Sequence, residues 1–304
     1  MNAIRLDGKV AIVTGSGRGL GLAFAQALAR AGASVVVNDV DESTARSAAE
    51  SIRSNGGEAI AEVVAVGDAT SADRLVTRAI ERYGRLDIVC ANAGILRDRV
   101  LWNMSDEEFD AVIETHLRGT FTCARAAVRH MRAQGTGGRL ILVSSIAGQR
   151  GNFGQTNYSA AKAGIAAFAR TWAMECARAN ITVNAIVPVA LTRMLASIPG
   201  LETHVEAAER GEAIPPRLRR LGLGTPDDVA SLVVFLASPY ADNVTGQCVG
   251  IGGDKLSLWS HPQEMRTAFH DGGWTAEDIA EAWPTSVGQE PQSYGDDLPK
   301  RISS

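Results

Sequence analysis

Short apolar runs alternate with longer amphipathic stretches through most of the chain, and this alternation restricts the fold more than any other feature. Each run suits a buried strand, and each intervening stretch suits a helix that returns the chain to the same end of a sheet. The pattern predicts an α/β fold, with a doubly wound, seven-stranded parallel sheet and helices on both faces. The expected strands span residues 9–14, 34–38, 58–64, 86–91, 139–144, 181–187 and 247–251.

The composition is that of an ordinary globular protein and argues against several kinds of partner. Thirty Lys plus Arg against 34 Asp plus Glu give a net charge of −4, which leaves no basic excess for a nucleic-acid backbone. No apolar run approaches the roughly 20 residues of a membrane span. The N-terminus has no signal-peptide pattern. We expect a cytoplasmic protein with a small-molecule substrate, and neither a nucleic-acid nor a membrane partner.

The cysteines and histidines do not predict a metal site. The four cysteines lie far apart without any C-x-x-C pair, and the five histidines lack the spacing of metal ligands. We therefore expect a chain that needs no metal.

The chain divides into one large domain and a C-terminal extension. Residues 1–253 carry the strand pattern, interrupted at 193–222 by a polar stretch that we interpret as a substrate lid. Residues 254–304 show no strand pattern but hold three of the five tryptophans. Because tryptophan is costly to leave in water, we expect this extension to pack on the domain or on a neighbouring subunit.

A glycine-rich turn follows the first expected strand and precedes an alanine-rich helix. A strand, a glycine turn and a helix start place backbone N–H groups and the positive helix end against a pyrophosphate. The sequence therefore predicts a dinucleotide site, with candidate residues Gly15, Ser16, Gly17, Arg18, Gly19, Leu20 and Gly21.

Two acids at strand ends extend this prediction. Asp39 closes the second strand, where a carboxylate accepts hydrogen bonds from the ribose hydroxyls of NAD and repels a 2′-phosphate. Arg18 would instead pair with such a phosphate. Because we give the acid more weight than the arginine, we expect NAD and keep NADP as the alternative. Asp68, followed by Ala69, stands after the third strand and either reaches the adenine or caps a helix.

The chemistry is predicted by a tyrosine and a lysine four residues apart. Tyr158 and Lys162 share one helix face, and Ser145 lies thirteen positions earlier at the end of a strand. A free tyrosine titrates near 10, but the lysine charge favours the phenolate. With Ser145 holding the substrate oxygen, these residues suit proton transfer coupled to hydride transfer at a cofactor.

Together these motifs resemble the short-chain dehydrogenase/reductase family over residues 5–253. The resemblance implies a Rossmann-type domain, NAD or NADP, a Ser-Tyr-Lys catalytic set and a homodimer or homotetramer. It also implies further cofactor contacts, at Asn92, Ala93, Gly94, Tyr158, Lys162, Pro188, Leu191 and Thr192.

One position departs from the family pattern and favours a narrower branch. His116 replaces an asparagine that holds a water in the proton relay, and it either donates to that water, acts as a relay or is simply packed. With the segments 92–99 and 151–158, it resembles the (3R)-hydroxyacyl-CoA dehydrogenase unit of peroxisomal multifunctional enzyme type 2 and its bacterial relatives. The expected substrate wall comprises Ser145, Ile146, Ala147, Asn152, Gln155 and Tyr158.

The expected function is an oxidoreductase that interconverts a secondary alcohol and a ketone, with a 3-hydroxyacyl-CoA as first-choice substrate. The lid arginines Arg217, Arg219 and Arg220 either contact the phosphates of CoA or are simply solvated. A hydrophobic non-thioester alcohol, such as a steroid, terpenoid or aromatic alcohol, remains the alternative. A nucleotide-binding protein without catalysis is a remote third reading.

Overall fold

One sheet organises the main part of the chain. In the computed structural model, which describes residues 3–192, 201–290 and 292, eight strands lie in the order β3-β2-β1-β4-β5-β6-β7-β8. The pairings from β3 to β7 are parallel, and β8 runs antiparallel to β7. The strands are β1 (Val10–Val13), β2 (Ser34–Asp39), β3 (Glu58–Val63), β4 (Ile88–Ala91), β5 (Gly138–Val143), β6 (Ile181–Pro188), β7 (Cys248–Gly252) and β8 (Lys255–Trp259).

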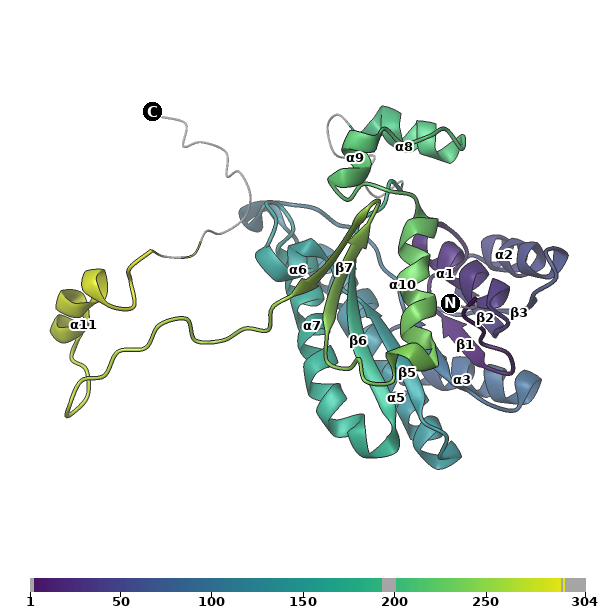
Figure 1. Ribbon diagram of the computed structural model, residues 1–304, viewed down its shortest axis with the longest axis horizontal. Coiled ribbons are helices and arrows are strands. Elements are labelled where there is room, and N and C mark those ends of the chain that lie inside the picture. The colour runs from purple at the N-terminus through teal and green to yellow at the C-terminus, as the bar shows by residue number, and fades with distance from the viewer. Residues whose placement is uncertain (1–2, 193–200, 291, 293–304) are drawn as a thin grey trace. The chain divides into compact units, whose positions relative to one another are not determined.

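Helices cover both faces of this sheet (Figure 1). One face packs against α1 (Gly19–Arg30), α2 (Glu42–Ser54) and α10 (Pro226–Ala237), and the other against α3 (Ala69–Tyr83), α5 (Gly119–Gln134) and α7 (Thr156–Cys176). The shorter helices are α4 (Asp106–Val112), α6 (Ile146–Arg150), α8 (Glu202–Glu209), α9 (Pro216–Arg220), η1 (Leu101–Asn103), η3 (Ala177–Ala179) and η4 (Pro239–Ala241), with a π-helical turn η2 (Ile113–Arg118).

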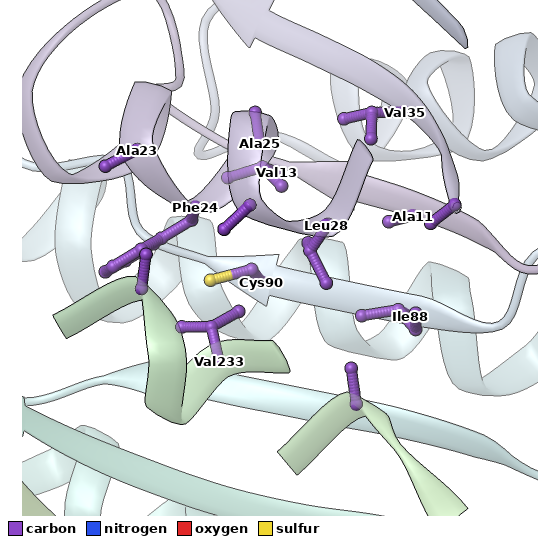
Figure 2. Close-up of a cluster of buried hydrophobic side chains, with 14 of the residues drawn as sticks. Ala11, Val13, Ala23, Phe24, Ala25, Leu28, Val35, Ile88, Cys90 and Val233 are labelled. Carbon is purple, nitrogen blue, oxygen red and sulfur yellow. The ribbon is translucent and has the colours of Figure 1, made fainter. Parts of the chain in front are cut away.

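The core follows from the alternation of side chains along each strand. Ala11 and Val13 of β1 point to the α1 face, while Val10 and Ile12 point to the α3 face. Figure 2 shows the buried cluster on the α1 face, in which Phe24 of α1 lies beside Cys90 of β4 and Val233 of α10. Burial on both faces explains why these strands are continuous apolar runs, and the expected doubly wound fold is confirmed.

The eighth strand is the feature that the strand pattern does not predict. Gly253 has a φ of +51° and forms with Asp254 a two-residue turn that folds Lys255–Trp259 back along β7. A glycine–aspartate pair between two strands is a hairpin signal, so the sequence did contain a sign of β8. The strand is easily overlooked because its leucines, Leu256 and Leu258, face solvent and leave no buried apolar run.

The sheet order also determines where a ligand site forms. The chain runs outward from β1 to β3 on one side and from β4 to β7 on the other, so the order reverses between β1 and β4. Ligands of open α/β sheets bind at such a reversal, outside the carboxyl ends of the strands. The glycine turn follows β1, the Asn92 segment follows β4 and Ser145 follows β5, so all three predicted site segments lie at this edge.

The compact unit containing the sheet ends at Trp259, and residues 260–304 form a second unit. In its described part, α11 (Ala276–Ala282) begins with a capping box between Thr275 and Asp278 and continues into η5 (Trp283–Thr285). The N–H of Gly288 donates to the carbonyl of Trp283 at 2.9 Å. Among the helices described in either unit, none is long and apolar enough to cross a membrane.

Candidate active site

The glycine turn is tightly held and leaves its helix start open. Ser16 donates from Oγ to the carbonyl of Val13 at 2.6 Å, and its N–H donates to the carbonyl of Asn38 at 2.7 Å. A Cβ atom at Gly21 would lie 2.2 Å from the carbonyl oxygen of Gly15, so only glycine permits this approach. Helix α1 begins at Gly19 without a side-chain cap. Its first N–H groups therefore face outward, as a pyrophosphate requires.

Asp39 lies directly against this turn. Its Oδ2 accepts from the N–H of Gly17 at 3.2 Å, and the residue is 8% exposed. Arg18 is exposed and forms no ion pair with the described residues, so the turn itself carries no fixed cation at this point. A carboxylate held here suits ribose hydroxyl groups, which donate hydrogen bonds, better than a phosphate.

The segment after β4 is joined to the same turn. Thr14 Oγ1 accepts from the N–H groups of Asn92 and Ala93, both at 3.0 Å. Asn92 in turn donates from Nδ2 to the carbonyls of Thr14 and Gly15 at 3.0 Å. The structure thus brings together the two predicted cofactor segments, which lie almost eighty residues apart in the chain.

Asp68 caps a helix in the structure. It precedes α3 and accepts from the N–H of Ser71 at 2.9 Å and from the Ser71 hydroxyl at 2.6 Å. These hydrogen bonds hold the pKa of the Asp68 carboxyl below its usual value. Ala69 is the first residue of the helix. The capping alternative is therefore observed, while contact with an adenine stays a prediction.

The residues after β6 close the other side of the site. Pro188 ends β6, and the N–H of Leu191 donates to the carbonyl of Gly224 at 2.7 Å. Thr192 is the last described residue before the predicted lid, whose residues 193–200 lie outside the described part of the chain. These positions are at the carboxyl end of β6, which agrees with a cofactor contact but does not test it.

The catalytic set assembles around the start of α7. Ser145 follows β5, and its hydroxyl lies close enough to Tyr158 to lower the pKa of the phenol against the effect of burial. Lys162 Nζ lies 5.5 Å from the centre of the Tyr158 ring and donates to the carbonyl of Val143 at 2.6 Å. Ser144 holds the backbone of Lys162 through an Oγ–carbonyl hydrogen bond of 2.8 Å. The predicted serine, tyrosine and lysine therefore meet at one place.

Burial controls the protonation of this set. It raises the pKa of Tyr158, and the nearby Ser145 hydroxyl offsets part of that rise. Burial also lowers the pKa of Lys162 from 10.5 to about 7, and among the described residues no carboxylate forms an ion pair with its ammonium. The expected help from the lysine charge is therefore incomplete in the protein alone, since a lysine with this pKa is only partly charged at neutral pH.

His116 is a buried neighbour of the tyrosine. Its ring lies edge-on to that of Tyr158 with the centroids 5.2 Å apart, and Nε2 is 3.0 Å from the N–H and 2.8 Å from the carbonyl of Ile95. Burial first, and then Lys162, lower its pKa to about 3. The imidazole is therefore neutral at physiological pH. Its Nδ1 is buried without a partner among the described residues, and a bound water would satisfy it.

The expected substrate wall also lies beside the tyrosine. Ile146 and Ala147 begin α6 directly after Ser145. Asn152 donates from Nδ2 to Gln155 Oε1 at 3.0 Å, and Gln155 donates from Nε2 to Asp98 at 2.9 Å.

Two residues at the rim of the site, beside the expected substrate wall, were not singled out from the sequence, namely Asp98 and Asn157. Asn157 is fully buried and donates from Nδ2 to the carbonyls of Arg97 and Glu108, both at 3.0 Å. Both residues lie within the segments 92–99 and 151–158 that carry the family resemblance, but their hydrogen-bond partners lie about fifty to sixty positions away in the chain.

One lid arginine has a structural role. Arg219 forms two hydrogen bonds with Asp228 at the start of α10 and one with Asp254 in the β7–β8 turn. Its guanidinium therefore joins α9 to the sheet edge and is not free for a CoA phosphate. Arg217 and Arg220 form no ion pair with the described residues and keep both of the readings given to them.

Comparisons with known proteins agree with this geometry. A family model described as short chain dehydrogenase matches residues 9–199. Hydroxyacyl-CoA dehydrogenase ChsB1 of Mycobacterium tuberculosis is 44% identical over 283 residues, covering 89% of this chain and 86% of that protein. Peroxisomal multifunctional enzyme type 2 of Drosophila melanogaster is 45% identical over 204 residues, covering 64% of this chain and 33% of that protein.

A solved structure supports the same assignment. The crystal structure of a short chain dehydrogenase from Mycobacterium avium superimposes with a TM-score of 0.79 at 38% identity, covering 94% of this chain and 96% of that one. The range matched by the family model spans the glycine turn, Ser145, Tyr158 and Lys162, and strands β1 to β6. The chain belongs to the short-chain dehydrogenase family and is an NAD(P)-dependent oxidoreductase that acts on CH–OH or ketone groups.

Proposed function

We propose that this oxidoreductase prefers NAD and interconverts 3-hydroxyacyl and 3-oxoacyl thioesters of the CoA type. The observation that carries the proposal is the meeting of Ser145, Tyr158 and Lys162 at the carboxyl edge of the sheet, where Lys162 Nζ lies 5.5 Å from the centre of the Tyr158 ring. The relative named as a hydroxyacyl-CoA dehydrogenase, which aligns with most of the chain, supports the thioester.

The protein side of the reaction is the movement of one proton. In alcohol oxidation, Ser145 holds the substrate oxygen and Tyr158 Oη takes its proton, while in the reverse direction Tyr158 returns the proton to the carbonyl oxygen. When bound, the nicotinamide cofactor of this family exchanges the hydride with the substrate carbon. Lys162 lies beneath the tyrosine ring and, when charged, favours the phenolate. Neutral His116 fixes the Ile95 segment beside them.

The preference for NAD rests on Asp39. Its carboxylate occupies the inner side of the turn, 3.2 Å from the N–H of Gly17, where a 2′-phosphate would meet a like charge. Asp39→Ala is expected to change the ratio of kcat/KM for NADH to that for NADPH by roughly tenfold or more in favour of NADPH. An unchanged ratio would remove Asp39 from this role.

The second candidate substrate is a hydrophobic alcohol or ketone without a thioester. Three large apolar side chains on the two loops beside the site are mostly exposed, namely Leu101, Trp102 and Phe153. The backbone N–H of Arg99 donates to the carbonyl of Gly154 at 2.8 Å, so the two loops that carry these side chains are joined. A bulky ring system would cover such surface as well as an acyl chain would.

The first test is the rate of NADH and NADPH consumption with acetoacetyl-CoA and with matched free cyclic, aromatic and terpenoid ketones. Preference for the thioester supports the first candidate, and preference for free ketones supports the second. Tyr158→Phe should lower kcat by at least about a hundredfold, whereas Tyr240→Phe, at an exposed tyrosine, serves as the control. Normal turnover by Tyr158→Phe would overturn the proposed mechanism.

Assembly and the C-terminal extension can be tested together. The family resemblance leads us to propose a homodimer or homotetramer, which sedimentation can measure. In the second unit, Trp274 is 39% and Trp283 is 54% exposed, so both have apolar surface available to pack on the domain or on a neighbouring subunit. Truncation after Trp259, which keeps β8, should change the assembly or the kinetics. If neither changes, the extension has no such role.

A further inference from the structure

The loop after β4 is firmly attached to the start of α7. The N–H of Arg99 donates to the carbonyl of Gly154 at 2.8 Å, and Asn157 holds the carbonyl of Arg97 at 3.0 Å. The backbone on both sides of Asp98 is therefore tied to the segment that leads into Tyr158. The position of the Asp98 carboxylate relative to the reacting centre is consequently defined by the fold, although the side chain itself is exposed.

A chain of amide hydrogen bonds orients this carboxylate. Asn152 donates to Gln155 at 3.0 Å, and Gln155 donates to Asp98 Oδ2 at 2.9 Å. Gln155 precedes Tyr158 by three residues at the N-terminal end of α7. The carboxylate is close enough to the tyrosine that its charge raises the pKa of Tyr158, in addition to the larger effect of burial.

The charge of Asp98 is not neutralised by its neighbours. Arg99 pairs with Glu108 at 3.2 Å, and Arg97 donates to the carbonyl of Leu96 at 2.7 Å. Within the described residues, Asp98 has no ion-pair partner, and its one hydrogen-bond donor is the neutral amide of Gln155. Among the described residues the Asp98 carboxylate therefore keeps its charge without an ion pair, at the edge of the catalytic site.

We propose that Asp98 is a specificity-determining residue whose carboxylate, oriented by Gln155, selects neutral acyl substrates and rejects free 3-oxo acids. This inference rests on the proposed function. In a 3-oxo acid the carboxylate is separated from the reacting carbonyl by a single methylene, so it must lie near Tyr158 and hence near Asp98. The carbonyl of a thioester or ester occupies the same place without a charge.

The size of the discrimination follows from Coulomb's law. Two unit charges roughly 8 Å apart at the edge of a protein, with partial solvent screening, repel each other enough to change an equilibrium by about five- to tenfold. The effect should weaken with added salt, because the Debye length is about 10 Å at 0.1 M and about 3 Å at 1 M.

The test compares a charged and a neutral form of one ketone. We would measure kcat/KM for acetoacetate and for the acetoacetyl thioester of N-acetylcysteamine, which lacks the phosphates of CoA. The wild type should prefer the thioester, and Asp98→Asn should shift the ratio about five- to tenfold toward the acid. The change in the pKa of Tyr158 affects both substrates equally and cancels in the ratio. If acetoacetate is not turned over, its inhibition constant against the thioester replaces its kcat/KM.

Two further variants separate charge from position. Asp98→Glu keeps the charge and should keep the preference for the thioester, whereas under a purely steric role Asp98→Asn, which keeps the shape, would keep the wild-type ratio and Asp98→Glu would change it. Asp110→Asn removes one exposed carboxylate from α4 and should leave the ratio as in the wild type. A ratio unchanged in Asp98→Asn, or changed equally in Asp110→Asn, would overturn the inference.

The proposed function and the role of Asp98 are refuted by different results. A wild type that ignores the thioester but reduces free ketones would refute the thioester proposal. The role of Asp98 would then be measured in the same way with a keto ester and its keto acid, and the same shift in the ratio would decide it.

Discussion

Replacing Lys162 by methionine should stabilise the protein without cofactor at and below neutral pH. Lys162 is 3% exposed, and the acceptor that it finds is the carbonyl of Val143. Burial lowers the pKa of its ammonium from 10.5 to about 7. Methionine is unbranched and of comparable length, so the variant removes the desolvated charge while it fills most of the same space.

The sign and size of the effect follow from proton linkage. Between pH 7 and 10.5 the unfolded chain binds more protons at Lys162 than the folded chain does, so the wild type gains stability as pH rises through this window. Well below pH 7 the lowered pKa costs the folded state about 5 kcal/mol. The carbonyl of Val143 loses its donor in the variant, which offsets about 1–3 kcal/mol of the gain.

Chemical unfolding at several pH values tests this reasoning. The free energy of unfolding of Lys162→Met should exceed that of the wild type at pH 6, and the difference should shrink by about 2.5 kcal/mol by pH 9. This pH-dependent part does not include any constant packing difference. Lys255→Met, at an exposed lysine of β8, should show no such pH dependence. A difference that stays constant with pH, or grows, would refute the buried-charge argument.

Two other substitutions test the packing around the site, and a third tests an ion pair at the opposite edge of the sheet. Gly94→Ala places a Cβ 2.1 Å from His116 Cε1, so it should lower kcat and destabilise the fold by roughly 1–3 kcal/mol. Adding His116→Asn makes room for the methyl group and should restore part of the lost activity and part of the lost melting temperature. Asn157→Ala removes three hydrogen bonds, so it should lower stability by roughly 2–4 kcal/mol and raise KM. An unchanged KM would show that the loop after β4 has no part in substrate binding. In the wild type, donors from Arg85, the Val10 N–H and Lys9 outweigh burial and lower the pKa of Asp87. Asp87→Asn should therefore lose roughly 2–4 kcal/mol at pH 7, a gap that should close as pH falls through the folded pKa, below 3.8; a pH-independent gap would contradict the ionic role.

The parts of the site that could be predicted from the sequence are those encoded by neighbouring residues. The glycine turn is one strand end and one helix start, and Tyr158 and Lys162 share a helix face because they are four residues apart. Ser145 joins them because the carboxyl ends of parallel strands meet at one edge. Once the strands were recognised, these three segments had to lie together.

The parts that could not be predicted depend on side chains that are distant in the chain. Gln155 meets Asp98 across 57 positions, and Arg219 meets Asp254 across 35. No periodicity in the sequence predicts such pairs, because each partner taken alone looks like a solvated polar residue. The protonation of Lys162 has the same origin, since its charge depends on burial that the whole fold creates.

Two buried charged positions distinguish structural from functional use of polar groups. Asp87 is 4% exposed and accepts hydrogen bonds from Arg85, Lys9 and the N–H of Val10, so its charge is fully compensated. In the part of the chain that the structure describes, Lys162 is equally buried but has no ion pair with a carboxylate, and Nδ1 of the neighbouring His116 has no partner. Because the fold supplies Asp87 with a full set of partners, the incomplete pairing of the Lys162 ammonium and the His116 imidazole has no structural explanation. Their place beside Tyr158 gives the reason, because an ammonium already satisfied by a carboxylate would have less effect on the phenolate.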